Sequence, residues 1–283
     1  MKPRHNHTFE ALGTHWALET LGNNNLSDEL VASVTQMVEQ FTRDYSRFDP
    51  QSLIGTLNTA GSIQHPSEEL RAMLAFAQKM FIASDGAFNI SIGGALHKLG
   101  YGSQQQAARV WVNPWPSISI DNEHIAIPQD MTIDFGGFGK GWLIDKLAVL
   151  FTNSGITEFI INGGGDLYIH TSTPTEIGLE HPYDSTKTIG STRISQGGLG
   201  VSSNIKRTWQ KDGNTHAHIL RPNESLPLQE HVISTYVRAD SALIADTMAT
   251  ILLLRPDLEA QLTKTFDLKV ILLTEDMLSS MTA

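Results

Sequence analysis

The stretch IDFGGFGKGWLIDK, residues 133–146, is typical of a buried strand followed by a glycine-rich turn and the start of a helix. A helix that begins directly after such a turn presents backbone N–H groups and the positive end of its dipole to an anion. Lys140 adds a positive charge, and the glycines let a ligand approach the backbone without a Cβ in the way. The stretch therefore predicts a phosphate site, with a turn that only permits tight packing as the alternative.

Two common phosphate-binding motifs do not match this stretch. A Walker loop requires Ser or Thr after its lysine, whereas Gly141 and Trp142 follow Lys140. A dinucleotide fingerprint requires the spacing G-x-G-x-x-G, which the glycines at 136–141 do not have. We therefore expect neither a P-loop nor a Rossmann domain.

The rest of the chain mixes predicted helices with short strands. Ser27 is typical of a helix N-cap, and a second helix is expected from Ser67 to the glycine at position 86. Because the strands outnumber a strict alternation with helices, we expect an α+β fold rather than a doubly wound one. Loop signals are densest at 113–130 and 170–188. The other expected elements are strands at about 14–21, 117–127, 131–135, 157–162, 166–170 and 268–273, and helices at about 139–153 and 240–254.

The composition excludes several kinds of partner and site. The 283 residues carry a formal net charge of −10 and no basic run, so nucleic acid is not an expected partner. The absence of cysteine excludes disulfides and thiolate metal sites. The longest apolar run, 248–254, is too short to span a bilayer, and the chain opens without a recognisable signal peptide. We therefore expect a cytoplasmic protein, or a periplasmic one if a leader has been removed.

Asp246 and Thr250 are the strongest candidates for a metal site. They are four residues apart on a predicted helix whose other positions are apolar, so they share one face. A carboxylate and a hydroxyl are hard oxygen ligands that suit Mg²⁺, which takes few protein groups and completes its shell with phosphates and water. The alternative is a hydroxyl bonded to its own helix and an Asp paired with a Lys or Arg.

Other polar motifs are less specific. The run INGGGD, 161–166, is typical of a tight hairpin connection, with a ligand contact as the alternative. His216 and His218 alternate on a predicted strand, so at most one of them points into any one cleft. A zinc hydrolase motif and a nucleophile elbow are both absent.

Seven segments follow one another along the chain: FEALGTHW (9–16), YSRFDPQSLIGTLN (45–58), SDGAFNISIGGALHKLGYG (84–102), IDFGGFGKGWLIDK (133–146), INGGGDLYIH (161–170), DGNTHAHILRP (212–222) and ADSALIADTMAT (239–250). Taken in order, they resemble the ApbE family, the FAD:protein FMN transferases formerly described as thiamine-biosynthesis lipoproteins. The resemblance implies one domain over residues 1–283 with a T-fold-like α+β architecture of mixed antiparallel sheets, packed helices and two closely packed lobes. It also implies Mg²⁺-dependent transfer of FMN from FAD to a Thr or Ser hydroxyl of an acceptor flavoprotein, with release of AMP.

The resemblance also implies roles for individual residues. Asp246, Thr250 and the carbonyl of Gly137 would bind Mg²⁺. His218 would lie near the reacting phosphate and accept the proton of the incoming hydroxyl, a role that Asp246 could share. The residues implied to bind FAD are Leu12, Ser46, Arg47, Phe48, Ala87, Phe88, Asn89, Asp134, Lys140 and His218.

Several positions depart from the family pattern. Asn89 replaces an aspartate, Arg221 reverses the charge of another, Leu53 replaces a glutamate, and Asn204 ends a segment that otherwise ends in glycine. These changes keep two alternatives to the transferase open. One is a noncatalytic FAD-binding protein, and the other is an FAD pyrophosphatase that releases FMN and AMP.

Overall fold

The structure is a computed structural model that describes residues 4–22, 25–101, 118–206, 208–211, 213–217, 219–220 and 232–282. The chain forms two compact units, which are described separately below. Unit 1 comprises Met1–Thr42, Phe138–Lys206 and Glu230–Ala283, and unit 2 comprises Arg43–Gly137 and Arg207–Gln229. Both contain helices and antiparallel strands, so the predicted α+β class is confirmed, whereas the single-domain assignment stays a prediction.

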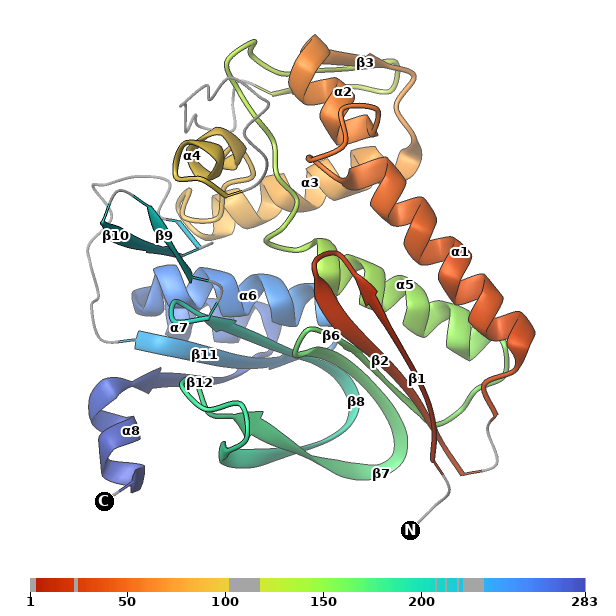
Figure 1. Cartoon of the computed structure of the whole chain (residues 1–283), viewed down its shortest axis with the longest axis vertical. Coiled ribbons are helices and arrows are strands. Elements are labelled where there is room, and N and C mark those ends of the chain that lie inside the picture. The colour runs from red at the N-terminus through yellow and green to blue at the C-terminus, as the bar shows by residue number, and fades with distance from the viewer. Residues whose placement is uncertain are drawn as a thin grey trace. The chain divides into compact units, whose positions relative to one another are not determined.

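Unit 1 is built on a seven-stranded sheet in the order β1-β2-β6-β7-β8-β11-β12, with every neighbouring pair antiparallel. The helices α5 and α6 lie along one face of this sheet (Figure 1). The strands are β1 (Arg4–Ala11), β2 (Thr14–Leu21), β6 (Phe159–Gly163), β7 (Asp166–Glu180), β8 (Thr188–Ser203), β11 (Val232–Ala239) and β12 (Lys269–Thr274). The helices are α1 (Asp28–Tyr45), whose last residues belong to unit 2, α5 (Gly139–Asn153), α6 (Ala242–Leu254), η2 (Pro256–Leu258), α7 (Glu259–Phe266) and α8 (Glu275–Thr282).

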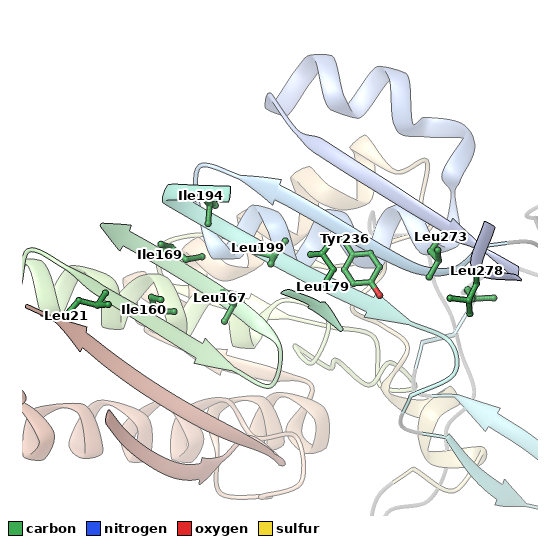
Figure 2. Close-up of a cluster of buried hydrophobic side chains, with 11 residues drawn as sticks. Leu21, Ile160, Leu167, Ile169, Leu179, Ile194, Leu199, Tyr236, Leu273 and Leu278 are labelled. Carbon is green, nitrogen blue, oxygen red and sulfur yellow. The ribbon is translucent and has the colours of Figure 1, made fainter. Parts of the chain in front are cut away.

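A cluster of apolar side chains covers the other face of this sheet (Figure 2). Leu167 on β7 pairs in register with Leu199 on β8, and Tyr236 on β11 pairs with Val201, so these side chains share a face. Leu278 of α8 packs into the same cluster. The cluster consists of Leu21, Ile160, Leu167, Ile169, Leu179, Ile194, Leu199, Ile233, Tyr236, Leu273 and Leu278.

Glycines on β8 bring the sheet unusually close to α6. A Cβ on Gly198 would lie 2.3 Å from the carbonyl oxygen of Ser241, and one on Gly200 would lie 2.2 Å from that of Ala245. Real Cβ atoms do not approach backbone at these distances, so the two positions require glycine. The backbones of β8 and α6 therefore meet directly, which fixes how α6 lies over the sheet.

Unit 2 contains helices, a small sheet and a hairpin. The three-stranded sheet has the order β3-β5-β4, and β9 pairs with β10. Ser52 and Ser67 cap the starts of α2 and α3 by accepting hydrogen bonds from Gly55 N and Leu70 N. The elements are α2 (Leu53–Ala60), β3 (Ser62–Gln64), α3 (Glu68–Ala83), α4 (Gly93–Lys98), β4 (Ser119–Ile120), β5 (His124–Ala126), β9 (Thr208–Lys211) and β10 (Asn214–Ala217).

Two predictions from the sequence were wrong. Residues 131–135 form no strand, although Met131, Ile133 and Phe135 are buried. Their backbone is held by single bonds instead of a ladder: Asn58 bonds both the N–H and the carbonyl of Ile133. The loop expected at 170–188 was wrong for 170–180, which belong to β7, and only 181–187 connect β7 to β8.

Candidate functional site

Lys140 lies in the first turn of α5, in unit 1. The helix begins after Phe138, whose side chain makes no cap hydrogen bond, and Trp142 N donates the first helical bond to Phe138 O at 3.0 Å. The predicted helix at 139–153 is therefore confirmed to the residue. Its first turn carries no acidic residue, so the positive end of its dipole depends on carboxylates from elsewhere.

The Lys140 ammonium lies between two buried carboxylates. Its Nζ is 2.8 Å from Asp166 Oδ2 and 3.2 Å from Asp246 Oδ1, and both carboxylate side chains are at most 3% exposed. Asp246 Oδ2 also accepts a hydrogen bond from Gly141 N at 3.0 Å. Lys140 and Asp246 are thus brought together as a pair, which was the alternative that the sequence left open.

Burial sets the protonation of this cluster. Desolvation, helped by the nearby charge of Asp166, raises the pKa of Asp246 from 3.8 to about 7, against the opposing effect of Lys140. Two carboxylates face one ammonium, so the fully ionised cluster carries a charge of −1. A group whose pKa lies near 7 can take up or release a proton under physiological conditions.

Asp166 is a site residue that the sequence reasoning missed. It is the first residue of β7 and follows Gly164 and Gly165, which have φ values of +70° and +102°. This hairpin turn, as predicted, connects β6 to β7. Asp166 Oδ1 accepts a hydrogen bond from Val201 N at 3.0 Å, which leaves Oδ2 directed at Lys140. An acidic residue directly after a glycine-rich turn was the only signal in the sequence.

Thr250 lies one turn after Asp246 on α6, so the two share a face as predicted. The Thr250 hydroxyl is 3.0 Å from the hydroxyl of Ser202 on β8. It therefore meets the neighbouring strand, whereas the hydroxyl of Thr247 bonds its own helix at Leu243 O. Ser202 is a second residue that the sequence reasoning missed.

The donor set of Asp246 and Thr250 fits a magnesium ion. The Asp246 carboxylate bonds Lys140 and Gly141 and, with about four lone-pair positions, retains capacity for a further partner. Mg²⁺ commonly takes one or two protein oxygens and keeps several waters. Among the described residues no group of three or more His, Asp or Glu side chains forms a site of higher protein coordination. The magnesium assignment stays a prediction.

In unit 2, Arg47 and Asp134 form a buried ion pair. The Arg47 side chain is 6% exposed and that of Asp134 is 10% exposed. Arg47 also donates to the carbonyl of Tyr101 at 3.1 Å, and its guanidinium carbon lies 4.2 Å from the ring centre of Phe48. Phe48 is 53% exposed, which is unusual for a large apolar side chain. Three residues predicted to bind FAD are therefore brought together in this unit.

The other FAD candidates of unit 2 lie in turns. Asn89 Oδ1 accepts bonds from the backbone N–H and the hydroxyl of Ser91, both at 2.9 Å, while Ala87 and Phe88 are buried. Asn89, where the resemblance implies an aspartate, thus organises a local turn with its amide oxygen. A Cβ on Gly137 would lie 3.1 Å from the Phe88 ring.

The remaining candidates are spread over the chain. Leu12 lies in the turn between β1 and β2 with a φ of +51°. The Ser46 hydroxyl accepts a bond from Phe48 N at 3.3 Å. His218 lies outside the described residues. The roles of these three residues in binding or catalysis stay predictions.

A family model and several curated proteins match most of the chain. The model of the ApbE family matches residues 12–272. The FAD:protein FMN transferase of Escherichia coli K12 is 21% identical over 94% of this chain and 83% of its own length, and one from Klebsiella pneumoniae is 25% identical over 80% and 75%.

Solved structures show the same fold. The ApbE protein of Thermotoga maritima superposes with a TM-score of 0.84 at 19% identity, covering 97% of this chain and 95% of its own. The flavin transferase ApbE of Vibrio cholerae gives 0.79 at 17% identity, covering 97% and 94%. None of the described helices is both long and apolar enough to cross a membrane.

Proposed function

Because this chain belongs to the ApbE family, we propose that it is a transferase that moves FMN from FAD to an acceptor flavoprotein. The relatives that match it over four fifths or more of its length carry this activity in their names. The observation that carries the proposal within the structure is the cluster of Lys140, Asp166 and Asp246 beside the Thr250 hydroxyl. It supplies a fixed cation and hard oxygen ligands, the two kinds of group that a pyrophosphate substrate requires.

In this proposal the acceptor is a Thr or Ser hydroxyl. Its oxygen forms a bond to the FMN phosphorus, the bond between that phosphorus and the bridging oxygen breaks, and AMP leaves. The hydroxyl proton passes to a basic side chain. His218 is the candidate for this role because the ordinary pKa of imidazole lies near neutrality. Asp246 is the second candidate, because its carboxylate lies in the same cluster as Lys140.

Lys140 and the metal ligands have separate tasks. Lys140 is held by Asp166, so its ammonium stays in place to neutralise phosphate charge without first being ordered by the substrate. Asp246 and Thr250, together with the carbonyl of Gly137, are the proposed ligands of Mg²⁺. When bound, the ion would offset the charge on the pyrophosphate oxygens.

The flavin dinucleotide contacts proposed for unit 2 rest on Arg47, Phe48 and Asp134. The Arg47–Asp134 pair is buried and holds its guanidinium against the Phe48 ring, and the rest of this ring is exposed and available to contact a ligand. An exposed aromatic ring held in this way suits stacking on a flat heterocycle. Ser46, Ala87, Phe88 and Asn89 belong to the same proposal, as do Leu12 and Lys140 in unit 1.

The test uses the purified chain, FAD, Mg²⁺ and several flavin-accepting domains. Mass spectrometry of the acceptor should show the mass of FMN added at a Thr or Ser, with one AMP released for each FMN transferred. Asp246→Ala should abolish this product, whereas Asp257→Ala, which alters a carboxylate paired with Arg255 elsewhere on the chain, should retain it.

The same experiment separates the two alternatives. FMN and AMP that accumulate without an acceptor would identify a pyrophosphatase. FAD that binds and stays intact with every acceptor would identify a noncatalytic binding protein. Failure to bind FAD with or without Mg²⁺ would overturn the proposed function.

A further inference from the structure

The first turns of α5 and α6 are in direct contact within unit 1. A Cβ on Gly141 would lie 2.7 Å from both the carbonyl oxygen of Ala242 and Cα of Leu243. Only glycine fits at this distance, so the backbone of α6 rests on α5 at position 141. The contact lies one turn before Asp246 on α6, and it brings together the starts of both helices.

A side chain of α5 caps the start of α6. Asp145 Oδ1 accepts a hydrogen bond from Ala242 N at 2.8 Å, and Oδ2 accepts one from Leu243 N at 3.0 Å. Ser241, the local N-cap, accepts the next bond from Ile244 N at 3.1 Å. The carboxylate of Asp145 thus binds two amide groups that a helix leaves without an internal partner.

A side chain of α6 caps the start of α5 in return. Asp246 Oδ2 accepts the hydrogen bond of Gly141 N at 3.0 Å, in the turn where the local N-cap, Phe138, provides no side-chain bond. Gly141 and Asp145 are four residues apart on α5, and Ala242 and Asp246 are four residues apart on α6. Each helix therefore carries an amide that is capped by the other helix and, one turn later, a carboxylate that caps the other helix.

From this reciprocal arrangement we infer that Asp145 is a positioning residue for Asp246. One hydrogen-bonded link between two helices leaves each free to turn about that point, whereas two links a turn apart fix both their separation and their rotation. The link through Asp145 therefore sets the rotation of α6 that directs Asp246 at Gly141 and Lys140. The consequence for metal and substrate binding rests on the proposed function, but the coupling between the two links does not.

The coupling is tested by backbone amide hydrogen exchange, followed by NMR in the full chain without FAD or metal. In Asp145→Ala the Gly141 amide, which does not contact Asp145, should lose protection by about tenfold or more relative to amides in the second half of α6. Ser241→Ala removes the local cap of the same helix and a side-chain bond to Asp145, but it keeps both bonds from Asp145 to the α6 backbone, so it is the matched control. It should expose the Ile244 amide and leave the Gly141 amide protected.

A second variant keeps the test available if Asp145→Ala does not fold. Asp145→Asn retains one acceptor oxygen and should reduce Gly141 protection in the same direction by a smaller factor. The inference would be overturned if Gly141 were equally protected in Asp145→Asn, Ser241→Ala and the unaltered chain. It would also be overturned if both variants lost the same amount of Gly141 protection. Either result would make Asp145 a cap of α6 and nothing more.

Metal titration then separates this inference from the proposed function. If the unaltered chain binds Mg²⁺ by calorimetry, Asp145→Ala should weaken that affinity by about tenfold or more and Ser241→Ala should not. If the unaltered chain binds no Mg²⁺, the metal assignment fails, while the exchange result at Gly141 still decides the role of Asp145. Loss of Gly141 protection with unchanged Mg²⁺ affinity would refute the link from Asp145 to the metal site.

Discussion

Replacing Lys140 by methionine tests the charge cluster of unit 1 most directly. The change keeps a long side chain but removes the ammonium that lies between Asp166 and Asp246. Because both carboxylates are almost fully buried, neither can turn to water for compensation. We expect the metal-free variant to fold with a lower free energy of unfolding, and the loss to depend on pH.

The magnitude follows from the burial and the pKa. Removing one partner of a buried ion pair typically costs about 3–5 kcal/mol. At pH 7.5 the cluster of the variant can return to a charge of −1 if one carboxyl takes up a proton. Because the pKa of Asp246 is about 7, that proton costs about 1 kcal/mol at pH 7.5, whereas at pH 5.5 Asp246 is already protonated in the unaltered chain and no further proton is needed. The loss of stability should therefore be about 3–5 kcal/mol at pH 7.5 and smaller by about 1 kcal/mol at pH 5.5.

Urea unfolding at the two pH values, followed by circular dichroism, measures this difference. Lys187→Met is the control, because Lys187 is 70% exposed and pairs with Asp184 at the surface. Its loss should stay below about 1 kcal/mol at both pH values. The reasoning is refuted if Lys140→Met costs no more than the control at pH 7.5, or if its cost does not fall at pH 5.5.

Further predictions concern the helix contact, the pH profile and unit 2. Gly141→Ala should lower the free energy of unfolding, measured in urea, by about 1–3 kcal/mol, because its Cβ would collide with the backbone of α6. Gly139→Ala is the control: its Cβ would lie 3.9 Å from the nearest atom, so the change should be neutral or slightly stabilising. Burial raises the pKa of Asp246 from 3.8 to about 7, so its contribution to the stability of the metal-free chain is present at low pH and is lost progressively as the pH rises from about 4 to about 7. Asp246→Asn should flatten this part of the unfolding profile. Arg47→Ala should lower the melting temperature by several degrees, because Asp134 is left buried without its partner. Arg71→Ala, which removes a partly exposed arginine bonded to Asn122, is the control, and a decrease for Arg47→Ala no larger than that of the control would contradict this expectation.

Elements with a strong local pattern could be predicted from the sequence. The helix at Gly139–Asn153 follows from the glycines before it and the apolar positions within it, and β2 was predicted at Thr14–Leu21. β8 was missed because its run of polar residues and glycines has no regular alternation of apolar residues. Its glycines serve the contact with α6, which no local pattern expresses.

The candidate site was predictable only where its residues share one element. Asp246 and Thr250 are a turn apart on α6, so periodicity alone places them on one face. Asp166 and Ser202 reach the same cluster from β7 and β8, and their approach depends on how the strands pair and how the helices pack. The partners of a buried charge therefore could not be identified from the sequence.

The glycines of β8 also act as a steric check on strand register. On β8 the face toward α6 consists of Gly198, Gly200 and Ser202. Leu199 and Val201, which alternate with them, point to the apolar cluster on the other face. A slip of one residue would direct leucine and valine side chains into the backbone of α6, where even a methyl group has no room. Mispaired β8 therefore cannot dock α6, and every molecule that completes this interface also has Ser202 opposite Thr250.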